Sequence, residues 1–259
     1  MAGWCRVTDA STWGVAVSLI LVAVALTVSL RFRLGLGSDL AVATVRAIVQ
    51  LSVVALVITF VFEHEVLAAG VIIMMLGAAA WTSARRLSGI PRAPQLAILA
   101  ISSGAVAGLV VLFGAGVFDV EPRFLIPIAG MLIGNCMTAV SVAGARVREE
   151  LTDKTLEVEA RLALGVRARE ALNPYIRRAT TTALIPIIDT TKTVGLIALP
   201  GAFTGMLIAG APPAQAARVQ LIVLFMLLGA VAISGMTTSL LVARMFVGPG
   251  ERIVLPPER

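Results

Sequence analysis

The sequence predicts an all-α, polytopic membrane protein, a helical bundle with about seven transmembrane helices. Two observations support this fold class. The 259 residues are 58% hydrophobic and 14% charged, with a mean hydropathy of +0.97, which is more apolar than a soluble core of this length requires. The apolar residues also form long continuous runs, whereas the strands of a membrane barrel alternate apolar and polar side chains. We therefore expect a single transmembrane domain over residues 1–259.

The spans can be placed from the uncharged runs, each near or above the roughly 20 residues that a helix needs to cross about 30 Å of hydrocarbon. These runs are residues 10–30, 66–84, 93–118, 124–145, 193–217 and 219–243. A further span, at about residues 40–62, is interrupted only by Arg46. The first run is longer than a signal-peptide core and lacks a clear small-residue cleavage site, so we expect it to remain as an anchor.

The distribution of Lys and Arg predicts the orientation. The segments after spans one, three, five and seven hold 17 of these residues, against three in the N-terminal segment and the alternate loops. Because cationic flanks stay on the cytoplasmic side, we expect the N-terminus outside and the C-terminus in the cytoplasm. The protein is then a multi-pass protein of the cell inner membrane. Its net charge of +6 is explained by topology and the lipid bilayer, with no nucleic acid partner.

The polar segment 146–192, between spans five and six, is expected to protrude into the cytoplasm as two helices. The stretch 147–164 is rich in helix formers, Gly165 marks its end, and Asn173-Pro174 marks the start of a second helix. Helical spacing places one apolar set on one face: Leu156, Ala160, Ala163 and Leu164. It places a charged set on another face: Lys154, Glu157 and Arg161. Val158 and Leu162 interrupt the separation between the apolar face and the charged face.

Polar side chains at membrane depth usually face a cavity or a partner. Three pairs at helical spacing are candidates: Arg46 and Gln50, Asn135 and Thr138, and Asp189 and Lys192. Arg46 either faces a cavity or extends to the cytoplasmic headgroups. Asp189 and Lys192, at the expected cytoplasmic entrance of span six, form either a structural ion pair or a substrate contact. Asn135 either bonds a neighbouring helix or lines a translocation path.

Proline and glycine mark two further features of the spans. Pro200 removes a backbone donor inside span six and should kink or break it beside Gly201, which makes this position a candidate hinge. Gly-xxx-Gly spacings allow helix backbones to approach closely, and we expect them to serve packing within the chain. They occur at Gly104/Gly108, Gly130/Gly134 and Gly201/Gly205.

The sequence has no Gly-x-x-x-x-Gly-Lys-Ser/Thr phosphate loop and no Cys/His cluster with zinc spacing. We therefore expect no catalytic residues, metal ligands or cofactors in this chain. Any ATP hydrolysis must take place in a partner. A protruding helical segment with an exposed apolar stripe is suited to docking into a groove of such a partner.

Motifs support this interpretation. Glu159-Ala160-Arg161-x3-Gly165 resembles the Glu-Ala-Ala-x3-Gly coupling motif of ABC importer permeases, with Arg161 in place of the second Ala. Four longer stretches are RAxxQL at 46–51, IPIAGMxxGN at 126–135, LxLG at 162–165 and ALIPxxDxxKTVGLxxLPGxxxGxxxxGxxP at 183–213. These stretches carry a resemblance, over nearly the whole chain, to the FetB (YbbM) type of ABC transporter permease, whose plant relatives include the STAR2/ALS3 aluminium-tolerance proteins.

The resemblance implies a permease subunit that pairs with a separate ABC ATPase. We expect that ATPase to bind ATP and Mg, and we expect two copies of this chain to form a homodimer. The bacterial member is associated with iron export and the plant relatives with aluminium tolerance and UDP-glucose transport. We expect export of iron or another metal, free or complexed. The alternatives are an ABC permease for a nucleotide sugar, an ion-coupled secondary transporter that uses Asp189 or Arg46, and a regulatory membrane scaffold.

Two sets of residues carry this hypothesis. The ATPase-coupling set is Glu159, Ala160, Leu162, Leu164 and Gly165. The translocation or gating set is Arg46, Gln50, Asn135, Thr138, Asp189, Lys192, Pro200 and Gly201.

Overall fold

The computed structural model describes residues 12–62 and 64–248, and every regular element in these ranges is a helix. The chain divides into two compact units, Met1–Glu63 and His64–Arg259. The first unit contains α1 (Thr12–Arg31) and α2 (Gly37–Phe62), which pack against each other. The chain reverses between them where Arg33 and Gly35 have positive φ angles, a conformation that glycine adopts without steric cost.

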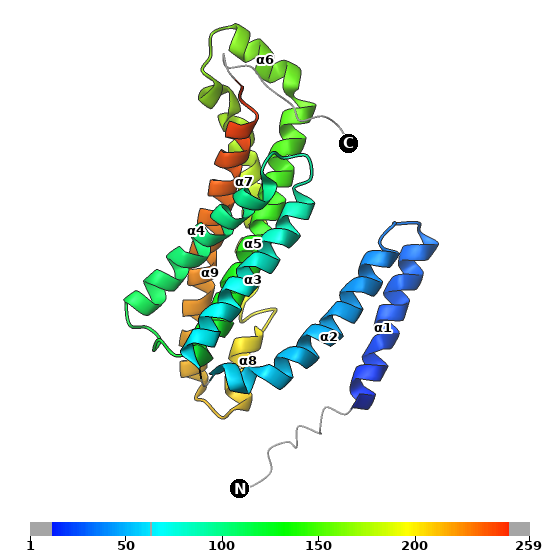
Figure 1. Ribbon diagram of the computed structural model, residues 1–259, viewed down its shortest axis with the longest axis vertical. Coiled ribbons are helices and arrows are strands. Elements are labelled where there is room, and N and C mark those ends of the chain that lie inside the picture. Colours follow the sequence, from blue (N-terminus) through cyan, green and yellow to red (C-terminus); the bar gives the residue numbers. More distant parts are fainter. Residues whose placement is uncertain (1–11, 63, 249–259) are drawn as a thin grey trace. The chain divides into compact units, whose positions relative to one another are not determined.

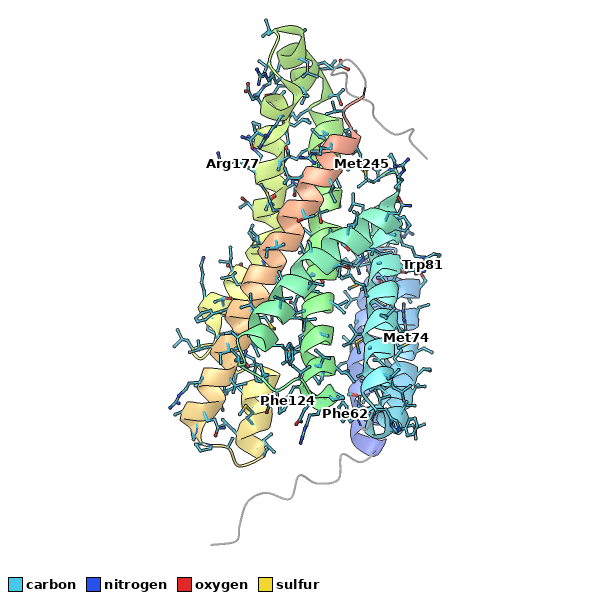
Figure 2. The ribbon with its side chains drawn as sticks, turned by 60° about the vertical axis from the view of Figure 1, so that its left-hand side comes forward. Phe62, Met74, Trp81, Phe124, Arg177 and Met245 are labelled. Atoms are coloured by element: carbon cyan, nitrogen blue, oxygen red, sulfur yellow. The ribbon has the colours of Figure 1, made fainter. Side chains whose placement is uncertain are left out.

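The second unit is a bundle whose centre is α5 and α9. Its helices are α3 (Glu65–Arg86), α4 (Ala93–Gly114), α5 (Pro122–Asp153), α6 (Thr155–Ala163), α7 (Ala168–Thr193), α8 (Gly201–Ile208) and α9 (Pro213–Met245). α5 contacts α3, α4, α7 and α9, and α9 also contacts α4, α7 and α8. Within this unit α6 lies at one end and α8 at the other (Figure 1). Figure 2 shows Arg177 and Met245 towards the α6 end and Phe124 towards the α8 end.

Small residues bring α4 and α9 into close contact. The backbone of Gly104 lies against Ala230 and Ser234 of α9, and Gly108 lies against Leu132 of α5. The Ser234 hydroxyl donates a hydrogen bond of 2.8 Å to the carbonyl of Ala100. Such contacts replace the hydrophobic driving force that is absent between helices in lipid.

The tight packing predicted for glycine pairs is therefore confirmed at Gly104/Gly108. It is not found at Gly201/Gly205, where an added Cβ would meet nothing within 4 Å. Gly134 is equally open, and Gly130 has only Met75 at an ordinary distance of 3.8 Å.

Six helices in the described ranges are long and apolar enough to cross a membrane, which confirms the prediction of a polytopic helical membrane protein. Their spanning portions are Gly14–Arg31, Gly37–Ile58, Val66–Arg86, Ala93–Gly114, Pro122–Asp153 and Pro213–Met245. These match predicted spans one to five and seven. Predicted span six, over 193–217, does not correspond to one of these helices, because residues 194–200 are not helical and the short α8 follows them. The break next to Pro200 was predicted and is confirmed.

The boundaries inside 146–192 also differ from expectation. α5 continues to Asp153, so the stretch 147–164 is split between α5 and the short α6. Gly165, with φ +82°, ends α6 as predicted. α7 begins at Ala168 and includes Pro174, so its predicted start at Asn173-Pro174 was a few residues late.

Candidate functional site

α6 is held to the bundle by the residues that interrupt its amphipathic pattern. Val158 is fully buried and belongs to the same core as Leu151 of α5 and Tyr175 of α7. Leu162 is half-buried against this core. Burial raises the pKa of the Tyr175 phenol, so this residue stays protonated at neutral pH. Val158 and Leu162 thus fix which face of α6 points inward.

The opposite face of α6 is apolar and uncovered in this unit. Leu156 and Leu164 are 82% and 84% exposed, and Ala160 and Ala163 between them are exposed as well. The predicted apolar set therefore lies together on the outside of the helix. Of the other coupling candidates, Glu159 and Gly165 are also exposed, whereas Leu162 points towards the core.

A charged cluster fixes α5 to α7 beside α6. Glu150 is 7% exposed and forms an ion pair of 2.8 Å with Arg146, one turn earlier on α5. Its second carboxylate oxygen lies 3.6 Å from Arg178 of α7. Arg146 also pairs with Glu149 at 2.7 Å. The cluster was not singled out from the sequence, because only the fold brings Arg178 to Glu150.

α7 and α9 run antiparallel, and two contacts fix their register. The Thr180 hydroxyl donates a 3.0 Å hydrogen bond to Ser239, and Ala183 lies 3.8 Å from a Cβ built on Gly235. At 1.5 Å per residue, Asp189 lies about 14 Å beyond Thr180, level with Ala230. Ala230 is close to the middle of the uncharged run 219–243.

α7 ends at this depth with part of its last turn bonded to the link that follows. The carbonyl groups of Thr190 and Thr193 accept backbone amides of the link at 3.1 and 2.9 Å. The chain turns at Gly195, which has φ +83°, and its amide donates to the carbonyl of Ala198. These bonds reduce the cost of ending a helix in apolar surroundings, where a free carbonyl group is costly.

α8 continues alongside α9 after the break. Phe203 of α8 and Ala217 of α9 line one cavity, so α7, the link and α8 together follow α9 from Ser239 to Ala217. These 22 residues of α9 correspond to about 33 Å, close to the thickness of a bilayer core. Pro200 directly precedes α8 and Gly201 is its first residue. The broken segment is thus long enough to serve as a crossing that starts earlier in the sequence than predicted.

Asp189 and Lys192 lie in the last turns of α7, just before the break. Both side chains are exposed in the unit, and within the described structure neither forms an ion pair. The register with α9 places both residues near the middle of the bundle. Their position at the entrance of span six stays a prediction. The pairing of these two side chains within one chain, which we left open, is not observed.

Asn135 lies at nearly the same depth. Its neighbour Cys136 lies 3.0 Å from a Cβ built on Gly104, which is itself level with Ala230. Asn135 and Thr138 are exposed and bond carbonyls of their own helix, at 2.8 Å to Met131 and 3.2 Å to Gly134. Within this unit Asn135 therefore makes no bond to another helix.

Arg46 and Gln50 belong to the first unit. Both lie on α2, are exposed within that unit, and share a face as predicted from their spacing.

Gln220 was missed by the sequence interpretation. It is 6% exposed, and its Oε1 atom has no hydrogen-bond partner among residues 12–62 and 64–248. It lines a cavity of about 310 Å³ beside the break, together with Gly195, Pro200 and Phe203. The sequence could have identified Gln220, because a glutamine inside an apolar run is a polar side chain at membrane depth, as Asn135 is.

A membrane bundle with a protruding apolar helix and a crossing broken at mid-depth is typical of a multi-pass transport protein. The chain belongs to the family described as uncharacterised protein family UPF0014, whose model matches residues 12–247. It is 38% identical to the UPF0014 membrane protein STAR2 of Oryza sativa over 80% of this chain and 74% of that protein. It is 37% identical to Protein ALUMINUM SENSITIVE 3 of Arabidopsis thaliana, over 87% and 84% of the two chains.

A bacterial relative is named as a permease. The probable iron export permease protein FetB of Escherichia coli is 33% identical, over 93% of this chain and 94% of that protein. No solved structure matches the chain. The resemblance stated from the motifs is therefore confirmed, and the chain is a multi-pass membrane protein of a permease-like family.

Proposed function

We propose that this chain is the membrane-spanning subunit of an ABC transporter, with the path formed by two copies and a separate ATPase bound to each. The exposed apolar face of α6 is the observation that supports this most. Four apolar side chains on a helix held by Val158 form a small, rigid surface of the kind that docks into a groove. In this arrangement α6 and the C-terminus are cytoplasmic, the N-terminus is outside, and the membrane is the inner membrane of the cell.

The contacts around α6 suggest how force would pass to the path. Closure of the ATPase pair on ATP would push α6, which shares a core with α5 and the start of α7. The ion cluster at Glu150 ties the same two helices together. α7 then carries the displacement to the break at residues 194–200, where a chain without helical hydrogen bonds can bend. Coupling of this kind requires a different contact in each of two states.

The cargo we propose is iron or another metal, exported free or complexed. The support is the printed name of FetB, to which this chain is similar over nearly its whole length. Within the described ranges, no three His, Cys, Asp or Glu side chains form a group that could hold a metal ion. Asp189, the Asn135 amide and backbone carbonyls at the break are the oxygen atoms that a cation would meet on this route.

One observation favours a second candidate, an ion-coupled secondary transporter. Asp189 is an exposed carboxylate near mid-depth, and such groups serve as coupling sites in transporters that use no ATP. In that case ATP would have no effect on flux, whereas an ABC permease would lose flux completely without ATP.

The test is transport by vesicles that contain this chain and the ATPase encoded nearest to its gene. Iron, other metals and nucleotide sugars are offered with ATP or without it. Leu164→Glu places a charge on the exposed face of α6 and should abolish ATP-driven flux, while Arg169→Ala, an exposed change outside that face, should not. Flux that is independent of ATP, or equal in both variants, would contradict the proposal.

A further inference from the structure

One face of α7 is left uncovered in the second unit, although it lies at the depth of the bundle's middle. Ile185, Asp189 and Lys192 are exposed along it, spaced by four and three, and the half-buried Thr182 extends this stripe by three residues towards the start of the helix. This is the spacing of a helix–helix seam. The buried face of the same helix carries Ala179, Ala183 and Ile187, which pack into the bundle.

Lipid is a poor cover for this stripe. It would face an unpaired carboxylate and an unpaired ammonium group near the middle of the hydrocarbon, where charged side chains are expensive. It would also face the non-helical link that follows, where Leu196 is 89% exposed and Ile197 is 77% exposed. Irregular backbone at membrane depth occurs where protein or a water-filled cavity covers it. The stripe therefore needs a cover other than lipid, either protein or a water-lined path, that meets both charges.

A second copy of this chain meets this requirement. In a dimer with its two-fold axis along the membrane normal, the two α7 helices run parallel and present identical stripes to each other. Asp189 of one copy then lies about 4.5 Å along the axis from Lys192 of the other, an offset that the lysine stem can span. The two acids and two bases alternate around the axis, and their charges sum to zero.

We propose that two copies of this chain pack through the α7 stripe, with Asp189 of each copy paired to Lys192 of the other. This pair of ion bridges closes the path at mid-depth, next to the break in the crossing. The inference rests on the proposed dimeric permease and adds where its copies meet and which groups hold them closed.

Disulfide cross-linking of the purified chain tests the interface without any ATPase. In a Cys5→Ser background that keeps the buried Cys136, Ile185→Cys should form a cross-linked dimer on mild oxidation. Leu99→Cys is the matched control. It is 61% exposed, lies beside Ala100, which bonds Ser234, and is therefore at the same depth on a different helix. Equal cross-linking at both positions, or none at Ile185→Cys, would overturn the proposal.

Charge reversal tests the ion bridges. Asp189→Lys and Lys192→Asp should each lower the Ile185→Cys cross-link about tenfold, because each places like charges together. The double variant Asp189→Lys/Lys192→Asp restores opposite charges and should recover the cross-link. Thermal unfolding of each variant checks that the chain is folded, and a double variant that is folded but no better than the single changes would refute the bridges. A chain that cross-links as expected but binds no ATPase would contradict the proposed function and leave this interface standing.

Discussion

Gly104→Ala should destabilise the second unit, because α4 has no room for a methyl group at this position. The added Cβ would lie well under 3.0 Å from both the carbonyl oxygen of Ala230 and the hydroxyl of Ser234. Either the two helices separate or the serine gives up its hydrogen bond to Ala100. Overpacking of this kind costs about 1 to 3 kcal/mol and the lost bond about 1 kcal/mol, while the better helix propensity of alanine returns about 1 kcal/mol.

The net loss is therefore about 1 to 3 kcal/mol, which corresponds to about 2 to 4 °C for each kcal/mol in a chain of this size. Thermal unfolding of the purified protein in detergent measures it. Gly134→Ala is the matched control, since α5 gains the same helix propensity there and the new Cβ meets nothing within 4 Å. If both variants melt at the same temperature, the close approach of α4 and α9 is not as described.

Three further changes probe the α6 end and the break. Gly165→Val forces a β-branched residue to φ +82°, which costs about 1 to 2 kcal/mol locally. The variant should uncouple ATP hydrolysis from flux while membrane insertion stays normal. Unchanged flux would count against the coupling role of Gly165. Glu150→Gln should lower the free energy of unfolding by about 1 to 3 kcal/mol, because this buried carboxylate forms ion pairs with two arginines. Glu149→Gln, at an exposed pair, should cost less than about 1 kcal/mol, and denaturant titration compares the two variants. Gln220→Leu removes a buried amide whose Oε1 atom has no partner among the described residues, so stability should rise by about 1 to 2 kcal/mol while transport falls. A variant that is no more stable would show that this oxygen is satisfied.

The sequence predicted which residues of α6 share a face, but it did not predict which face turns towards the bundle. A period of 3.6 residues identifies Leu156, Ala160 and Leu164 as one face. It cannot say whether that face or the one with Val158 turns towards the bundle, because both contain apolar side chains. Only the packing of α6 on the core around Tyr175 determines which face is inward. The smaller apolar set, Val158 and Leu162, is the inner one.

The broken crossing was misplaced for a different reason. Asp189, Lys192 and the threonines around them lower the local hydropathy, so an uncharged run starts only at residue 193. The depth of these residues depends on the register between α7 and α9, which a hydropathy profile of one segment does not contain. The break itself was predictable, because Pro200 lacks the backbone donor that a continuous helix needs.

The docking of an ATPase on α6 is tested most directly by a photo-activated cross-linker at Leu164 in cells of the source organism. Leu164 should capture a protein with a phosphate-binding loop, and the same probe at Arg169 should capture far less of it. If Leu164 reacts only with lipid, or with reagents confined to the outside of the cell, α6 is not the contact through which ATP drives transport.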